Sequence, residues 1–133
     1  MIYYVNCQSA GGDGSKDNPF RTIQQAADIA IAGDEIIVSP GIYREAVNPQ
    51  NGGSPDARIT YRSCVPYAAV ITGAERVTDW TSLGNGVWHA SVSNTLFIDR
   101  NPYTTLVSGD WFIASFIAHT GDVYLNGKSL YEV

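Results

Sequence analysis

The sequence predicts a mostly β chain that is built as a parallel β-solenoid and capped by one α-helix. Short β-rich runs alternate with turn residues, and one segment near the N-terminus has helical periodicity. Two similar strand segments, Ile36-Ile37-Val38 and Ile59-Thr60-Tyr61, lie 23 residues apart. A repeat of this length without crossover helices is typical of a solenoid, because each coil stacks its strands on the previous coil. An antiparallel sandwich fits the strand pattern as an alternative.

The chain of 133 residues has the length of one domain. We therefore expect a single domain over residues 1–133, with a cap at residues 1–34 and the first coils and associated strands at residues 35–133. The net charge is −5 at pH 7, which disfavours nucleic acid and anionic membranes as partners. No residue pattern indicates a cofactor.

The expected helix spans residues 22–32. Thr22 and Gln25 form a capping box at its start, and Gly33 supplies the stop. Its apolar face consists of Ile23, Ala26, Ala27, Ala30 and Ile31. Its polar face consists of Gln24, Gln25 and Asp28. A polar outer face is what the cap of a solenoid requires, although a helix packed on a small α+β sheet has the same amphipathicity.

The expected strands are short runs bounded by Gly, Pro, Asn or Asp. They span residues 3–5, 35–39, 42–47, 58–63, 69–72, 87–92, 111–117 and 123–125. Gly84-Asn85-Gly86 predicts a hairpin turn between Trp80 and Trp88. These two indoles are expected to pack on each other or on the flank of the solenoid.

The N-terminus and the cysteines favour a protein that is not exported. The first residues lack the basic and apolar regions of a signal peptide, so a cytoplasmic location is expected. Cys7 and Cys64 are the only cysteines. We expect both to be reduced, with a disulfide between them as the alternative.

Two groups of motifs resemble known carbohydrate-active proteins. The first group resembles the N-terminal cap and first coil of right-handed parallel β-helix proteins: DG at 13–14, NPFRTIQQA at 18–26, AGDEIIV at 32–38 and GIYRE at 41–45. The second is more selective and resembles the β-xylosidases of glycoside hydrolase family 120: NPY at 101–103, GDW at 109–111 and GDVYLNGKSLYEV at 121–133. Together the motifs cover nearly the whole chain.

This resemblance implies a retaining enzyme that releases xylose from xylo-oligosaccharides, folded as a parallel β-helix with an inserted β-sandwich. The family's Asp nucleophile and Glu acid/base lie downstream of the matched region, so no catalytic residue is expected in these 133 residues. The resemblance thus implies an N-terminal fragment of a longer enzyme. This fragment would contribute the cap, the first coils and one wall of the sugar site, and would be inactive alone.

Trp111, Asp110 and His119 are the candidate substrate-binding residues. An indole stacks on the apolar C–H face of a sugar and keeps one N–H for a hydroxyl, although a core position also explains Trp111. Asp110, like Asp122, follows a Gly and precedes an expected strand, so turn formation explains both. His119 can donate to a sugar hydroxyl, or simply face solvent from a loop. No metal-ligand spacing surrounds it, and no metal is expected.

Two other functions fit the same architecture. A β-helix polysaccharide lyase needs Ca²⁺ or basic groups to neutralise uronate carboxylates, which the net charge of −5 disfavours. A non-catalytic β-helix that serves as a binding or surface module is the other alternative. We also expect the isolated chain to self-associate through its C-terminal side, residues 111–133, because a cut solenoid exposes strand edges.

Overall fold

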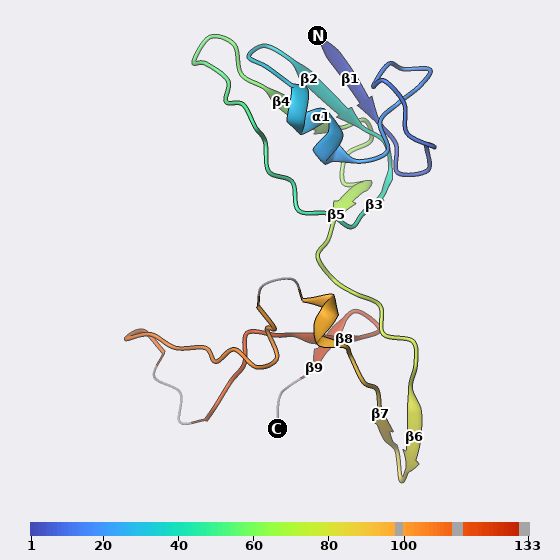
Figure 1. Cartoon of the computed structure of the whole chain (residues 1–133), viewed down its shortest axis with the longest axis vertical. Coiled ribbons are helices and arrows are strands. Elements are labelled where there is room, and N and C mark those ends of the chain that lie inside the picture. The colour runs from blue at the N-terminus through green and yellow to red at the C-terminus, as the bar shows by residue number, and fades with distance from the viewer. Residues whose placement is uncertain (98–99, 113–115, 131–133) are drawn as a thin grey trace. The chain divides into compact units, whose positions relative to one another are not determined.

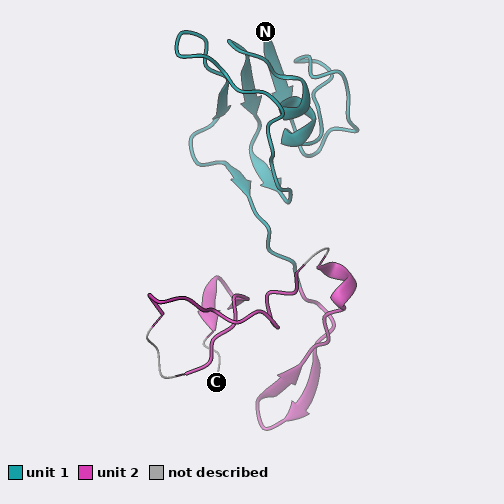
Figure 2. Ribbon diagram, turned by 60° about the vertical axis from the view of Figure 1, so that its left-hand side comes forward, with its two compact units in different colours: residues 1–76 teal, residues 77–133 magenta. Residues whose placement is uncertain are grey.

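The computed structural model describes residues 1–97, 100–112 and 116–130. Its contacts divide the chain into two compact units, Met1–Arg76 and Val77–Val133, which Figure 2 colours separately. The described residues are mostly β with one α-helix, as the sequence predicts. A division of contacts does not test whether the units fold independently, so the expectation of one domain stays a prediction.

Unit 1 (Met1–Arg76) contains two small parallel sheets (Figure 1). The first has the order β1 (Ile2–Val5), β2 (Glu35–Val38), β4 (Thr60–Ser63), and the second pairs β3 (Gly41–Tyr43) with β5 (Ala69–Ile71). The two strands of each pair are separated by a long stretch of chain, as stacked coils require. Both sheets are open, so they establish parallel stacking without establishing a β-helix.

The stacking of β4 on β2 follows the repeat that the sequence predicts, with a shifted register. Ile36 lies opposite Tyr61, whereas the sequence aligned Ile36 with Ile59. A shift of two residues keeps every side chain on the same face of the sheet. The shift therefore leaves the two alternating sets of β4 side chains on the same faces of the sheet.

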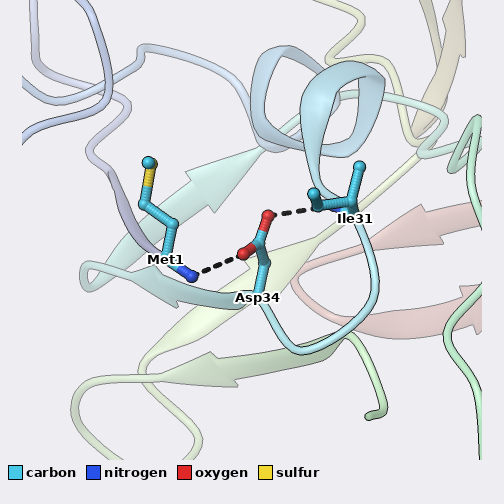
Figure 3. A network of polar contacts seen from close by, with 3 residues as sticks. All are labelled: Met1, Ile31 and Asp34. Carbon is cyan, nitrogen blue, oxygen red and sulfur yellow. Dashed lines mark hydrogen bonds and ion pairs between the residues drawn. The ribbon is translucent and has the colours of Figure 1, made fainter.

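Helix α1 (Ile23–Ile29) begins where the sequence predicts and ends early. The capping box is confirmed: Gln25 N donates to Thr22 Oγ1 at 3.2 Å, and Thr22 N donates to Gln25 Oε1 at 3.0 Å. The expected end at residue 32 is wrong, because the C-cap residue Ala30 is already extended. Ile31, expected on the buried face, is exposed. Its N–H donates to the Asp34 carboxylate at 2.9 Å (Figure 3), so the chain turns there instead of continuing the helix.

The core of unit 1 lies between α1 and the parallel strands. Its members are Val5, Phe20, Ile23, Ala26, Ala30, Ile36, Val38 and Tyr43. The expected strand at 42–47 stops at Tyr43 because Glu45 turns back to α1. The Glu45 carboxylate accepts the N–H groups of Ile23 and Gln24 at 2.9 and 2.8 Å, which satisfies two otherwise unpaired donors of the helix N-terminus.

Unit 2 (Val77–Val133) contains two antiparallel hairpins, β6 (Thr81–Gly84) with β7 (Val87–His89) and β8 (Val123–Leu125) with β9 (Lys128–Leu130). A short 3₁₀ helix, η1 (Asn94–Leu96), follows β7. The predicted turn at residues 84–86 is confirmed: Asn85 and Gly86 have φ of +51° and +79°. Asn126 and Gly127 repeat this conformation at +52° and +76°, which is what a two-residue hairpin turn requires.

Several expectations for unit 2 are wrong. The strand at residues 87–92 ends at His89, and the described residues of the expected strand 111–117 are not in a strand; residues 113–115 lie outside the described part. Trp80 and Trp88 are both exposed, and the predicted packing of one on the other is wrong, whereas their packing on the flank of the solenoid stays a prediction. No ring contact joins them within the described chain, because Trp88 lies opposite Ser82 and the Trp80 indole N–H donates to Val77 O at 2.9 Å.

Two expectations concern the membrane and the cysteines. None of the described helices has the length and apolar character needed to cross a membrane. Cys7 is half-buried and Cys64 exposed, and both are free thiols, so the disulfide alternative is not realised.

Candidate functional site

Asp110 and Trp111 occupy a tight turn of unit 2. Phe112 N donates to Gly109 O at 2.9 Å, which closes the turn over these two residues. A Cβ atom on Gly109 would lie 2.5 Å from Trp111 Nε1, and the φ of Gly109 is +144°. Only glycine allows the indole to fold back over the turn in this way. The turn interpretation of Asp110 therefore agrees with its place in the structure.

Trp111 belongs to an exposed aromatic cluster rather than to a core. Its side chain is 73% exposed, and its ring centroid lies 5.9 Å from that of Phe112 in an edge-to-face arrangement. Phe112 contacts Phe116 in the same way at 6.3 Å. The indole thus has a partner that holds it and a large accessible face. An exposed aromatic face of this kind can stack on a sugar ring.

His119 lies half-buried on a second element of unit 2. It faces Leu106 in an isolated antiparallel bridge. Two backbone hydrogen bonds flank the bridge, from Val107 N to Ala118 O at 2.8 Å and from Thr120 N to Thr105 O at 2.9 Å. The bridge fixes the backbone of His119, so the expectation of a simple solvent-facing loop is incomplete.

Tyr103 connects the motifs of unit 2, although no functional role was predicted for it. Its ring covers Gly121, where a Cβ atom would lie 2.6 Å from the ring, and its hydroxyl donates to Asp122 O at 3.0 Å. Thr120 Oγ1 donates to Pro102 O at 3.1 Å beside it. The NPY motif at 101–103 and the Gly-Asp pair at 121–122 therefore meet in space. Both motifs belong to the same family resemblance in the sequence. No physical argument from the sequence predicted that they contact each other.

The Asp122 carboxylate is engaged within its own hairpin. It accepts a hydrogen bond from the Tyr124 hydroxyl at 3.2 Å. This bond, together with the negative charge, raises the pKa of the Tyr124 phenol. Asp122 thus forms a hydrogen bond within its own segment of unit 2.

Unit 1 has two hollows on the side where β4 and β5 are unpaired. The larger, about 450 Å³, is open and is lined by residues 49–61, with Arg58 and Tyr61 among them. The smaller, about 270 Å³, is mainly apolar and includes Val38, Ala69 and Ile71. Val38 lies in register with the buried Val5, and Ile71 with the buried Tyr43. The second hollow is the open end of the stacked core.

The acidic, His and Cys side chains of the described residues were compared with the geometry of a metal site. No group of three or more His, Cys, Asp or Glu side chains is placed to hold a metal ion in that part of the chain. The side chains of Trp111, Asp110 and His119 are chemically capable of stacking and hydrogen bonding.

Comparison with known proteins separates the two units. Residues 77–133 match the family model described as the glycoside hydrolase 120 insertion domain. Residues 8–50 match a model described as a protein of unknown function, DUF1565. A solved structure described as the complex of XylC with xylose is similar over 100% of this chain, with 43% identity and a TM-score of 0.93. Residues 77–133 are thus similar to the insertion domain of glycoside hydrolase 120 proteins, and the whole chain is similar to a part of XylC. The resemblance that the sequence predicts is thereby confirmed.

The chain spans only part of the length of the proteins that it resembles. The uncharacterized protein YwoF of Bacillus subtilis (strain 168) is 33% identical over 132 residues, which are 96% of this chain and 26% of that protein. The chain covers 21% of the solved XylC chain. It therefore spans about a quarter of the curated relative and about a fifth of the solved one.

Proposed function

We propose that this chain is the N-terminal part of a retaining glycoside hydrolase similar to a β-xylosidase, which acts on xylo-oligosaccharides. The similarity to XylC over the whole chain, at 43% identity, carries the proposal. The match of residues 77–133 to a glycoside hydrolase insertion domain supports it independently. The solved relative was determined with xylose, which supports a pentose as the sugar.

Unit 1 would form the cap and first coils of a right-handed parallel β-helix. The parallel register of β1, β2 and β4 and of β3 and β5 supports this. The apolar hollow at Val38, Ala69 and Ile71 supports it as well, since a further coil stacked there would cover the open core.

Unit 2 would contribute one wall of the sugar site. Trp111 supplies the stacking face, and Asp110 and His119 supply hydrogen-bonding groups. The exposure of Trp111 and its support by Phe112 favour this role over a core role. The catalytic carboxylates would lie outside these 133 residues, so the chain alone would be inactive.

The test compares Trp111→Ala with Trp80→Ala in a longer protein that contains this chain. Loss of stacking at Trp111 should lower kcat/KM on an aryl xyloside about tenfold. Trp80→Ala removes an exposed indole of the same unit and should leave kcat/KM within about twofold. If Trp111→Ala changed only the melting temperature, the stacking role would be wrong.

A second assay tests the parent activity itself. The chain 1–133 and the longer protein are compared on the same aryl xyloside. We expect turnover only in the longer protein, because general acid–base catalysis needs both positioned carboxyl groups. Turnover by the chain alone within tenfold of the longer protein would contradict the proposal. Formation of unsaturated products from a uronate polymer would instead indicate a lyase.

A further inference from the structure

His119 lies on a short segment, residues 118–122, whose position depends on residues 102–107. Two backbone hydrogen bonds join the two segments, one on each side of the bridge between Leu106 and His119. Neither segment belongs to a strand of the described chain. Because an isolated pair of extended segments is only marginally stable, side-chain contacts must help to keep this pair in register.

Tyr103 supplies such contacts through both its ring and its hydroxyl. The hydroxyl donates to Asp122 O at 3.0 Å, and a Cβ atom on Gly121 would lie 2.6 Å from the ring. The φ of Gly121 is outside the positive range that favours glycine, so the closeness of the ring accounts for a glycine at this position. Phe97 gives the ring a second partner, in an edge-to-face contact with 5.9 Å between the centroids.

The backbone from which the Tyr103 side chain projects is itself fixed. Tyr103 N donates to the side-chain oxygen of Asn101 at 2.9 Å, in the manner of an Asx turn. Pro102 O accepts the hydroxyl of Thr120 at 3.1 Å. The ring and hydroxyl of Tyr103 thus hold the residues directly after Thr120, and His119 directly precedes it. We call the contacts of Tyr103 with residues 121 and 122 the Tyr103 clamp.

We propose that Tyr103 is a positioning residue, which holds the His119 imidazole in place for a hydroxyl of the bound sugar. This role of Tyr103 rests on the proposed function, in which His119 contributes to the sugar site. Tyr103 acts through the backbone of Gly121 and Asp122. When the clamp is lost, the segment of His119 gains freedom, and binding of the sugar must then order a donor that the folded chain otherwise holds in advance.

Histidine NMR tests the positioning on the chain itself. The chain contains two histidines, so His89 serves as the internal reference for His119 when the imidazoles are labelled with ¹⁵N. We expect Tyr103→Phe, which removes only the hydroxyl, to shift and broaden the His119 signals and to leave those of His89 unchanged. Tyr124→Phe is the matched control, because that hydroxyl bonds to the carboxylate of Asp122 instead of its backbone oxygen. Equal His119 signals in the two variants would overturn the proposal.

Kinetics in the longer protein test the consequence for sugar binding. We expect Tyr103→Phe to raise KM for an aryl xyloside about fivefold and to leave kcat within about twofold, because a hydrogen bond that orders a binding residue is lost. Combining Tyr103→Phe with His119→Ala should add nothing to the effect of His119→Ala alone, since Tyr103 acts through His119. A lower melting temperature with an unchanged KM would reduce Tyr103 to a structural role and contradict the proposal.

Gly121→Ala tests the same clamp from the other segment. The added Cβ atom would displace the Tyr103 ring, so KM should rise as it does in Tyr103→Phe. With Tyr103→Ala the ring is absent, and Gly121→Ala should then have little further effect on KM. Additive effects of the two substitutions would show that the clamp does not exist.

The failure of this role and the failure of the proposed function give different results. If the longer protein is active and His119→Ala leaves KM unchanged, the sugar role of His119 and the positioning role of Tyr103 are both wrong, while the activity stands. If the longer protein has no activity on the xyloside, the proposed function is wrong. The NMR comparison of Tyr103→Phe with Tyr124→Phe then still decides whether Tyr103 holds the imidazole.

Discussion

Unit 1 and unit 2 differ in what holds their strands. All the buried hydrophobic side chains of the described residues belong to unit 1, and they lie between α1 and the parallel strands. In unit 2 the described strands form hairpins whose side chains are exposed, and the order comes from two-residue turns and from Tyr103. Burial therefore stabilises the first unit, whereas turn conformation and ring contacts order the second.

The two units can be observed separately by spectroscopy. Trp80, Trp88 and Trp111 are the three tryptophans of the chain, and all belong to unit 2. Helix α1 belongs to unit 1. Tryptophan fluorescence thus follows unit 2, while the helical part of the far-UV circular dichroism follows unit 1, and each substitution below can be assigned to a unit.

The largest difference is expected from removing core volume. Ile36 is 0% exposed in β2, and Ile36→Ala should lower the free energy of unfolding by about 3 kcal/mol. Leu125→Ala, on an exposed position of β8, should change it by less than about 0.5 kcal/mol. Urea titration measures both, followed by circular dichroism for Ile36→Ala and by tryptophan fluorescence for Leu125→Ala. Similar effects of the two substitutions would mean that unit 2 has a core of its own.

Glycines with positive φ in the two units should also differ. Gly14 has φ of +82°, and a Cβ atom there would lie 2.3 Å from the Phe20 ring. Gly127 has φ of +76° with no atom near its Cβ position. Gly14→Ala should destabilise by about 2 kcal/mol through strain and overpacking, and Gly127→Ala by about 1 kcal/mol through strain alone. Thermal unfolding compares them, and an equal loss would show that Phe20 moves freely.

Side-chain caps provide a smaller contrast. Thr22 caps α1, and Ser93 accepts the N–H of Thr95 at 3.2 Å at the start of η1. Thr22→Ala should lower the free energy of unfolding by about 1 kcal/mol. Ser93→Ala, in a three-residue exposed turn, should have an effect within about 0.5 kcal/mol. If Ser93→Ala lowered the free energy of unfolding more than Thr22→Ala, unit 2 would contribute more to the stability of the chain than this comparison predicts.

The smallest expected effect is on the stability of the chain at low pH. The pKa of Asp34 is lower in the folded chain than its ordinary value of 3.8, chiefly because its carboxylate accepts the N–H of Ile31. As the pH falls toward and below 3.8, the unfolded state therefore binds more protons than the folded state. The stability that Asp34 contributes decreases, and it is lost once the pH has fallen below the pKa of Asp34 in the folded chain. Asp34→Asn should flatten this acid decline of the circular dichroism midpoint. Asp56→Asn, an exposed control, should retain the decline.

Local signals in the sequence predicted local structure well. The capping box of Thr22 and Gln25 involves residues three positions apart, so its pattern is sufficient to locate the start of α1. The turn at residues 84–86 is similarly encoded by Gly and Asn. The parallel pairing of β2 with β4 followed from a repeat, although the register differed by two residues.

Contacts between distant residues could not be read from local pattern. Helix α1 ends early where Asp34 accepts the N–H of Ile31, and the same carboxylate pairs with Met1, 33 positions away. β6 and β9 have polar, exposed sequences without alternation, so no strand was expected there. Trp111 was predicted as a candidate from its chemistry, and its role stays a prediction. The contact of Tyr103 with Gly121 became apparent only in the structure.

The side-chain amide of Gln24 has a consequence for the ageing of the protein. It accepts the N–H of Asn48 at 2.6 Å and donates to Asn48 O at 2.9 Å, so it imitates a peptide group in a sheet and holds the loop after β3 against α1. It also donates to the Asp28 carboxylate at 2.6 Å. Hydrolysis of this amide to a carboxylate would replace both donations by repulsion from two oxygens. Slow deamidation at this single position would therefore release the loop while leaving the rest of the chain chemically intact.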